Sequence, residues 1–474
     1  MSEPVAFDLV VVGAGPAGQK AAIQAAKTGH SALVVERGVG VGGECVHHGT
    51  IPSKTLRQSA LALTALDRAS DGLLRREIPP DLTIEMLTRR QHQVREAHER
   101  YLSDQLTRNG VTLWEGHARC RTPHEIEVTG VDGSRRWARG VALLIASGSR
   151  PRTPPEIPVD HERVLDSDSI LTLTYLPRSL AVLGGGVIAC EFASIFSALG
   201  VAVTLVDRGP RPMPFVDPEL TDVFLAVLGR RGGRHLAGRR IASVQPTGVA
   251  EVTITLADGE ELRTEKVLCA LGRTAVANGL GLEDIGVRLD AAGLIVVDRE
   301  FRTSVPSVYA VGDVIGPPAL AATAMEQGRL AARHALGLGA DESVGPTPIG
   351  IYTLPEMASV GLGEDEAREG YGAVRVGRAR FSEITRGWIA GDTDGLLKLV
   401  VRDGDGLILG AHIVGEGATE LIHVAQVALV AGLTYPALIS NVFNFPTTAE
   451  AYRVAALHLA GQPATGRDRP ARAA

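Results

Sequence analysis

The chain has 474 residues, of which 45% are hydrophobic and only 4% aromatic, and it contains 55 glycines. This length suits about three domains, and the high glycine content favours tight turns between strands and helices over an aromatic-rich all-β core. A net charge of −6 without a basic cluster argues against nucleic acid and a membrane surface as partners. Small molecules are therefore the expected ligands.

Targeting and cysteine signals are weak. The apolar start at 7–12 lacks the basic segment and the cleavage site of a signal peptide. A later apolar stretch, 421–433, is shorter than the roughly 20 residues that a bilayer span requires. The four cysteines are far apart, at Cys45, Cys120, Cys190 and Cys269. Such spacing indicates a reducing compartment without a disulfide framework or a zinc site, so we expect a cytoplasmic protein.

Residues 7–36 predict a strand, a glycine turn, a helix and a second strand, an order typical of a dinucleotide-binding unit. The turn carries Gly13, Gly15 and Gly18 in the spacing GxGxxG. The first permits a tight turn, the second lets the backbone approach a pyrophosphate, and the third lets the helix pack closely on the strand. Glu36 ends the second strand, where a carboxylate can accept the hydrogen bonds of a ribose. This segment predicts a first dinucleotide cleft.

Residues 179–207 repeat the pattern. Gly184 and Gly186 take the first two glycine positions, and Ala189 takes the third, which serves only helix packing and tolerates alanine. Asp207 ends the following strand. Two intact patterns in one chain predict that two dinucleotides bind.

The choice between NAD and NADP at the second cleft stays open. Asp207 should accept the ribose hydroxyls of NAD(H) and repel a 2′-phosphate, whereas Arg208 and Arg211 follow it and could neutralise that phosphate. This mixture suits an enzyme that binds both nucleotides. It suits equally an NAD enzyme with surface arginines.

Six segments in chain order resemble the FAD-dependent pyridine nucleotide disulfide oxidoreductases. They are GAGPAG (13–18), GGEC with GTIPSKTLR (42–57), ASGSRP (146–151), GGGVIACE (184–191), ALGRT (270–274) and YAVGDVIG (309–316). The resemblance implies an α/β fold with two Rossmann-like dinucleotide-binding domains and a C-terminal α+β dimerisation domain. It places the FAD domain at 1–152 and 273–345, the NAD(P) domain at 153–272 and the dimerisation domain at 346–474, in a homodimer.

The resemblance also implies which residues hold the cofactors, FAD and NAD(P)(H). For FAD they are Gly13, Gly15, Gly18, Glu36, Gly43, Lys54, Gly148, Gly312 and Asp313. For NAD(P) they are Gly184, Gly186, Ala189, Asp207 and Arg208, with Gly272 at one of the two crossings between the FAD and NAD(P) parts.

Two departures from the family pattern decide the expected chemistry. Disulfide-reducing members carry CxxxxC beside the flavin, whereas this chain has Cys45 followed by Thr50. A hydroxyl can form neither a disulfide nor a thiolate, so disulfide relay is blocked. Phe445 stands where those members have a catalytic histidine, although Glu450 remains where the glutamate that orients that histidine would be.

One branch of the family, the soluble pyridine nucleotide transhydrogenases, resembles the chain at both places. The matching segments are 49–57, 167–171, 350–356 and 443–457. This resemblance implies that hydride passes from NADPH to FAD and then to NAD⁺ in a ping-pong reaction, which needs neither a second thiol nor a general acid. The cofactor would supply the chemistry and the protein its orientation.

Four residues are the candidate catalytic set: Cys45, Thr50, Lys54 and Glu191. Lys54 lies one helical turn after Thr50, so both should face the flavin, where a cation would stabilise negative charge. By family precedent Lys54 pairs with Glu191. Cys45 is either a packed neighbour of the flavin or a lone thiol open to oxidation.

Other interpretations stay open. The chain could reduce a quinone or another small acceptor, resemble a dihydrolipoamide dehydrogenase without disulfide activity, or serve as a redox sensor, although an intact second cleft argues against a sensor. His47 and His48 are adjacent, but we expect no metal site, because no carboxylate or cysteine is predicted at helical spacing to complete a set. His423 is expected at the subunit interface.

Overall fold

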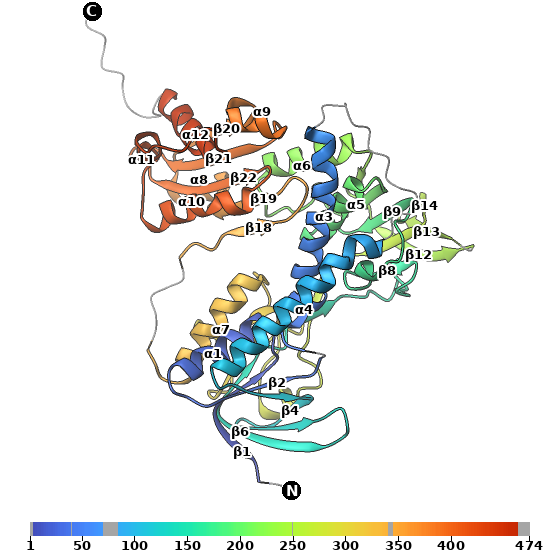
Figure 1. Ribbon diagram of the computed structural model, residues 1–474, viewed down its shortest axis with the longest axis vertical. Helices are drawn as coiled ribbons and strands as arrows, with labels where there is room; N and C mark the ends of the chain where they lie inside the picture. The colour runs from blue at the N-terminus through green and yellow to red at the C-terminus, as the bar shows by residue number, and fades with distance from the viewer. Residues whose placement is uncertain (1–2, 39, 70–83, 249, 340–344, 463–474) are drawn as a thin grey trace, which may run out of the picture.

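The computed structural model describes residues 3–38, 40–69, 84–248, 250–339 and 345–462, with side chains described for these residues except 65–69 and 84–88. Within these ranges no helix is both long and apolar enough to cross a membrane. Three bodies of sheet and helix are visible in Figure 1, and two long helices, α3 and α4, lie between them.

The first body is built on the N-terminal sheet, whose strand order is β3-β2-β1-β6-β5-β4, with β17 paired to β6. Its strands are β1 (Val5–Val12), β2 (Ala32–Glu36), β3 (Thr112–Glu115), β4 (His117–Thr122), β5 (Glu125–Thr129), β6 (Arg135–Ile145) and β17 (Val308–Ala310). β1, β2, β3, β6 and β17 run parallel, and β4 and β5 add an antiparallel extension. The central strands contain continuous buried apolar runs because both of their faces are covered there, at Leu9–Val12, Ala32–Val35, Ala142–Ile145 and Val308–Ala310.

Helices cover one face of the N-terminal sheet. They are α1 (Pro16–Lys27), α4 (Ile84–Arg108) and α7 (Ala321–Ala335), which share one apolar core with β1 and β2. α1 and α7 pack side by side although about 300 residues separate them, as Figure 1 shows. α2 (Gly43–His47) and α3 (Thr50–Ala69) follow β2, and the short helix η3 (Gly312–Ile315) follows β17. The predicted strands at 7–12 and 31–36 and the helix between them are confirmed, with β1 starting at Val5 and β2 at Ala32.

The second body is built on the central sheet, a parallel sheet with strand order β11-β10-β9-β15-β8. Its strands are β8 (Val164–Leu165), β9 (Ser179–Leu183), β10 (Ala202–Val206), β11 (Arg234–Leu236) and β15 (Lys266–Cys269). Around it lie α5 (Val187–Ala198), α6 (Pro218–Arg230), η1 (Ser169–Thr172), and an antiparallel sheet of β12 (Ile241–Thr247), β13 (Glu251–Leu256) and β14 (Glu261–Thr264). The second predicted strand, helix and strand are therefore confirmed at β9, α5 and β10.

A two-stranded antiparallel ribbon joins the first two bodies. It pairs β7 (Ser149–Pro151) with β16 (Arg273–Ala275), and beyond it the Arg152 N–H donates to the Gly272 carbonyl at 3.0 Å. The chain therefore enters and leaves the central body at neighbouring points. The short helix η2 (Glu283–Ile285) follows β16.

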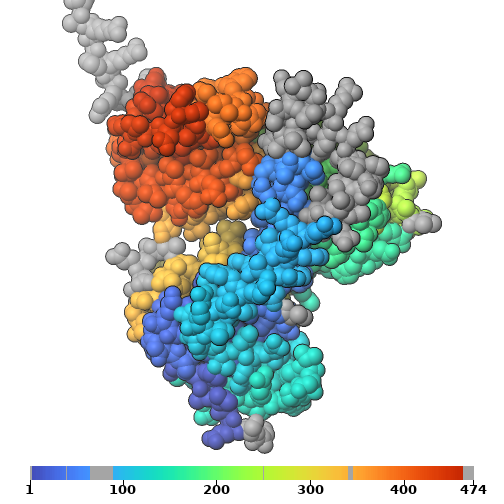
Figure 2. Space-filling view, viewed as in Figure 1, coloured from blue at the N-terminus to red at the C-terminus, as the bar shows by residue number. Residues whose placement is uncertain are grey.

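The third body holds the C-terminal sheet, which is entirely antiparallel, with strand order β18-β19-β22-β21-β20. Its strands are β18 (Ile349–Ile351), β19 (Met357–Gly361), β20 (Val374–Arg380), β21 (Leu396–Arg402) and β22 (Ile408–Val414). Its helices are α8 (Glu364–Tyr371), η4 (Phe381–Glu383), α9 (Thr385–Ala390), α10 (Ala418–Val430), α11 (Tyr435–Ser440) and α12 (Glu450–Gly461). In the space-filling view this body forms a lobe of its own beside the end of α3 (Figure 2).

One apolar core connects the second and third bodies through α3. Leu56 and Ala60 of α3 pack with α5, and the same cluster includes Leu354 and Met357 of the third body. This core fixes the direction of α3, which starts at Thr50. The predicted fold class, two dinucleotide-binding sheets and a C-terminal α+β body, is confirmed, whereas the exact domain boundaries stay a prediction.

Candidate active site

The first glycine turn has the geometry that a dinucleotide requires. Gly13 has φ +108°, and a Cβ there would lie 2.4 Å from the Ala146 carbonyl oxygen. A Cβ on Gly18 would lie 1.9 Å from the Gly13 oxygen, so α1 packs closely on the turn. Gly15, which caps α1, has no heavy atom within 4 Å of an added Cβ. The open space is therefore at the glycine where a pyrophosphate would approach the helix N-terminus.

Glu36 binds the same turn from the end of β2. Its Oε2 accepts the Ala14 N–H at 2.7 Å and its Oε1 accepts the Gly38 N–H at 2.8 Å. Gly43, the first residue of α2, is close enough that its Cβ would lie 2.9 Å from the Gly15 Cα. Glu36 and Gly43 thus border the turn, and together with Gly15 they fit the adenosine and pyrophosphate of FAD.

The third predicted FAD segment meets this turn from the C-terminal side. A Cβ on Gly312 would lie 3.5 Å from the Ala17 Cβ of α1. Asp313 accepts a 2.6 Å hydrogen bond from the Ser149 hydroxyl, next to Gly148 at φ +71°. Segments separated by more than 160 residues therefore meet beside this turn, where the resemblance predicts that FAD binds.

The second glycine turn repeats the first. Gly184 has φ +117°, and its Cβ would lie 2.5 Å from the Ala270 carbonyl oxygen. Gly186 caps α5 in open space, and Ala189 is fully buried. Gly272 also has a positive φ, +104°, with nothing near an added Cβ. The turn fits a second dinucleotide.

The end of β10 shows which charges surround that second turn. Asp207 is only 9% exposed and accepts the Gly209 N–H at 3.2 Å. A Cβ on Gly185 would lie 2.0 Å from the Asp207 Oδ2, so Gly185 is required as well, a residue to which the sequence pattern assigns no role. Arg208 is exposed.

Arg211 does not face this cleft in the way the sequence suggests. Its Nη1 donates to Asp222 at 2.5 Å, to the Thr221 hydroxyl at 2.8 Å and to the Pro218 carbonyl at 2.9 Å. These contacts hold Arg211 against the start of α6. Arg208 is therefore the better candidate for contact with a 2′-phosphate.

The predicted catalytic residues come together where α2, α3 and α5 meet. Lys54 donates to the Glu191 Oε2 at 2.8 Å, and the Glu191 side chain is only 5% exposed. The other Glu191 oxygen accepts the Tyr352 N–H at 2.9 Å, and the Lys54 ammonium lies 4.8 Å from the centre of the Tyr352 ring. The sequence pattern assigns no role to Tyr352, although its segment, 350–356, resembles the transhydrogenases.

Thr50 lies beside Cys45. Burial raises the pKa of the Cys45 thiol, against the opposing effects of a hydrogen bond with Thr50 and the positive charge of Lys54. Because burial is the larger effect, the thiol stays protonated near neutral pH. The position that would need a second thiol for a disulfide is thus occupied by a hydroxyl.

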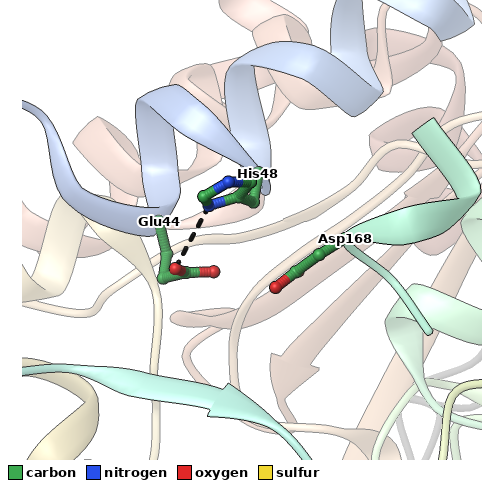
Figure 3. A group of neighbouring side chains, drawn as sticks. All are labelled: Glu44, His48 and Asp168. Atoms are coloured by element: carbon green, nitrogen blue, oxygen red, sulfur yellow. Dashed lines mark hydrogen bonds and ion pairs between the residues drawn. The ribbon is translucent and has the colours of Figure 1, made fainter. Parts of the chain in front are cut away.

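A second group of polar side chains lies near Cys45, two of them from α2 and its C-cap and one from another segment. The Glu44 Oε1 and the His48 Nδ1 are 3.3 Å apart, one helical turn from each other, and Asp168 faces them from the loop before η1 (Figure 3). Burial, followed by the negative charges of Glu44 and Asp166, raises the pKa of Asp168 to about 6. The sequence-based argument that no carboxylate stands at helical spacing from His48 is wrong, because Glu44 precedes it by four residues.

The C-terminal candidates are exposed in the single chain. Phe445 is 70% exposed, in the loop before α12, which starts at Glu450. His423 is exposed on α10 and its Nδ1 lies 2.8 Å from the Gln426 Oε1.

Comparison with known proteins defines the class. Residues 7–328 match the pyridine nucleotide-disulphide oxidoreductase family, and residues 347–456 match the dimerisation domain of the same family. The chain belongs to the pyridine nucleotide-disulphide oxidoreductase family. Membership confirms the predicted cofactors, FAD and NAD(P)(H), and both glycine turns leave open space at Gly15 and Gly186.

Particular relatives narrow the comparison. The chain is 44% identical, over 95% of its length and 96% of theirs, to proteins of Mycobacterium tuberculosis and Mycobacterium bovis named soluble pyridine nucleotide transhydrogenase. A protein of that name from Hahella chejuensis is 38% identical over 95% of this chain and 98% of its own. The resemblance to this branch is confirmed.

Solved structures show the same fold. LpdA from Mycobacterium tuberculosis superposes with a TM-score of 0.89 at 30% identity, covering 96% of this chain and 99% of its own. The HOCl-induced flavoprotein disulfide reductase RclA from Escherichia coli gives a TM-score of 0.85 at 25% identity, covering 95% and 99%. The fold is therefore shared with proteins of different named activity.

Proposed function

We propose that this oxidoreductase transfers hydride between NADPH and NAD⁺ through FAD, in a ping-pong reaction without a redox-active disulfide. The observation that carries the proposal is the position of Thr50, whose hydroxyl is a hydrogen-bond partner of Cys45 at the place where a disulfide reductase needs a second cysteine. The names of relatives that align over nearly their whole length support it.

In the proposed reaction the two glycine turns bind the dinucleotides, and Lys54 supplies electrostatic stabilisation. The two glycine turns offer helix N-termini to the phosphates of two dinucleotides. Bound FAD would supply the hydride acceptor and donor. Lys54, held by Glu191 and by the ring of Tyr352, keeps a fixed positive charge at the start of α3, where it favours the build-up of negative charge nearby.

Both nucleotides would use the second cleft in turn. The buried Asp207 carboxylate at the end of β10 would accept ribose hydroxyls, and the exposed Arg208 would contact a 2′-phosphate. Since Arg211 is held by α6, a single arginine would offset the repulsion between Asp207 and the phosphate. This arrangement favours dual use with weaker binding of NADP(H) than of NAD(H).

Anaerobic half-reactions test the proposal. The purified flavoprotein is reduced with NADPH, freed of nucleotide, and mixed in separate trials with NAD⁺, lipoamide and a quinone. We expect NAD⁺ to reoxidise the flavin, parallel lines in initial-velocity plots, and no long-wavelength charge-transfer band between a thiolate and the flavin. Failure of NAD⁺ together with rapid oxidation by lipoamide or the quinone would favour one of the alternative acceptors instead.

A further inference from the structure

The group of Glu44, His48 and Asp168 is not used by the proposed reaction. Two of its members belong to α2 and its C-cap, on either side of Cys45, and the third lies between β8 and η1 of the central body. One ligand-type atom of each side chain lies within 4.8 Å of the other two. In Figure 3 the three side chains point toward one another from two different segments.

The charges around this group favour a cation. Glu44 and Asp168 bring two carboxylates together, and the carboxylate of the buried Asp166 lies behind Asp168. Arg273 is 3.3 Å from the Glu44 Oε2, but it donates at 2.7 Å and 2.8 Å to the hydroxyl and carbonyl of Ser149. The charge of Arg95 also acts on His48. The two arginines offset only part of the negative charge of the three carboxylates.

The distances suit a small metal ion. Zinc binds imidazole nitrogen and carboxylate oxygen at about 2.0–2.2 Å, so ligand atoms on a tetrahedral ion stand about 3.4 Å apart. The Glu44 Oε1 and the His48 Nδ1 are already 3.3 Å apart. The Asp168 oxygen lies within 4.8 Å of the other two ligand atoms, so it needs to approach them by at most about 1.4 Å, a change that a side-chain rotation provides.

We propose that Glu44, His48 and Asp168 form a site for one divalent transition-metal cation of the zinc type, which links α2 to the segment before η1. One imidazole and two carboxylates are three protein ligands, and the fourth position is open to water. Binding requires a neutral imidazole with a free Nδ1, so His48 exchanges its contact with Glu44 for the metal and any proton on Nδ1 is released. Hard cations such as Mg²⁺ bind less well, because imidazole favours transition metals.

Titration of the holoenzyme with Zn²⁺ tests the site. Isothermal calorimetry of the metal-free flavoprotein should show one Zn²⁺ per subunit and a higher melting temperature in excess Zn²⁺, since a ligand of the folded state stabilises it. Mg²⁺ at the same concentration should give neither effect. Binding and stability are measured whether or not the enzyme transfers hydride.

Matched variants identify the ligands. His48→Gln and Asp168→Asn should each weaken Zn²⁺ binding at least tenfold, with flavin content and metal-free melting temperature close to those of the parent chain. His47→Gln is the control, because the neighbouring His47 directs its Nε2 toward the Val41 carbonyl at 3.3 Å. Cys45→Ser should retain binding, since sulfur is not in the proposed set.

Three outcomes would overturn the proposal. They are no saturable Zn²⁺ binding by the parent protein, equal binding by the His48 and Asp168 variants, and loss of binding in the Cys45 variant. The last outcome would assign the metal to the thiol.

Discussion

At the scale of single residues, the position of Lys54 is fixed from three directions. Its ammonium contacts the buried Glu191, lies over the Tyr352 ring and is near enough to Cys45 to affect its thiol. The Lys54 side chain is 27% exposed, against 5% for Glu191. A charge held in this way needs little reorganisation when negative charge forms beside it.

Replacement of Lys54 by methionine should therefore slow flavin reduction by NADPH about 10- to 100-fold and make the flavin midpoint potential more negative. Stopped-flow absorbance and a redox titration measure the two effects. Lys27→Met, at the exposed end of α1, is the control and should change neither. An unchanged midpoint potential in the Lys54 variant would show that its charge does not act on the flavin.

The sequence predicted the pairing of Lys54 with Glu191 only through the family resemblance, and the structure places the two at 2.8 Å. The motifs alone could not identify Tyr352, because that residue is almost 300 positions from Lys54 and meets it only through the third body.

The role of Glu44 is hidden in the sequence for another reason. Its spacing from His48 was visible, but Asp168 completes the group only after the fold brings two segments together.

At the scale of elements, α6 of the second body is joined to the C-terminal sheet by a buried charge. Lys398 on β21 is 4% exposed at its side chain and lies 2.8 Å from both Asp217 and Glu219, at the start of α6. Glu364 of α8 is 3.0 Å away. Asp217 also caps α6 by accepting the Glu219 N–H. Lys398 thus holds the residue that caps α6 and joins the second body to the third.

The same contact predicts a dependence of stability on pH. Hydrogen bonds from Arg378, then from Lys398, lower the pKa of Glu219 from 4.5 to about 2. Because the folded pKa is the lower one, the stabilisation is complete above pH 4.5 and is lost as the pH falls toward 2.

Glu219→Gln should therefore lower the free energy of unfolding by about 1 kcal/mol at pH 7, a small value because the side chain is partly exposed. Thermal melts between pH 8 and 3.5 measure the effect. The difference in melting temperature between the parent protein and the variant should become smaller as the pH falls below 4.5. Glu369→Gln, an exposed residue of α8, should leave the melts unchanged. A difference in melting temperature that does not change with pH would contradict the lowered pKa of Glu219.

At the scale of the whole molecule, α10 presents an apolar row to the surface. Val427 and Val430 are each 66% exposed, and Val424 is 36% exposed. The helix belongs to the matched dimerisation domain, so we expect this row to be covered by a second copy of the chain. His423, on the same face, would lie at that interface, as the sequence suggested.

Val427→Asp should shift the protein from dimer toward monomer, because burial of an unpaired carboxylate opposes association. Light scattering after gel filtration and sedimentation velocity measure the change. Val131→Asp, at a 94% exposed position between β5 and β6, is the control and should remain dimeric. A Val427 variant that stays dimeric at micromolar concentration would place the interface elsewhere.

The sequence predicted the two glycine turns and their strands well, because each depends on steric limits within about 30 neighbouring residues. It predicted side-chain direction less well where a distant partner decides it. Arg211 is the example, since its nearness in sequence to Asp207 suggests a role at the cleft, whereas Asp222 and Thr221 hold it on α6.

The ribbon of β7 and β16 has a consequence for how the chain reaches its fold. β17 pairs with β6 and α7 packs on α1 only after some 300 residues have been synthesised. The chain between α1 and α7 is a long loop, and closing such a loop is slow. Once residues between the ribbon strands have folded, the bond from Arg152 to Gly272 keeps their two ends together. The effective loop is then about 120 residues shorter, and its closure entropy is correspondingly smaller. Folding of the central body therefore brings the chain back to the N-terminal sheet, where β17 pairs with β6.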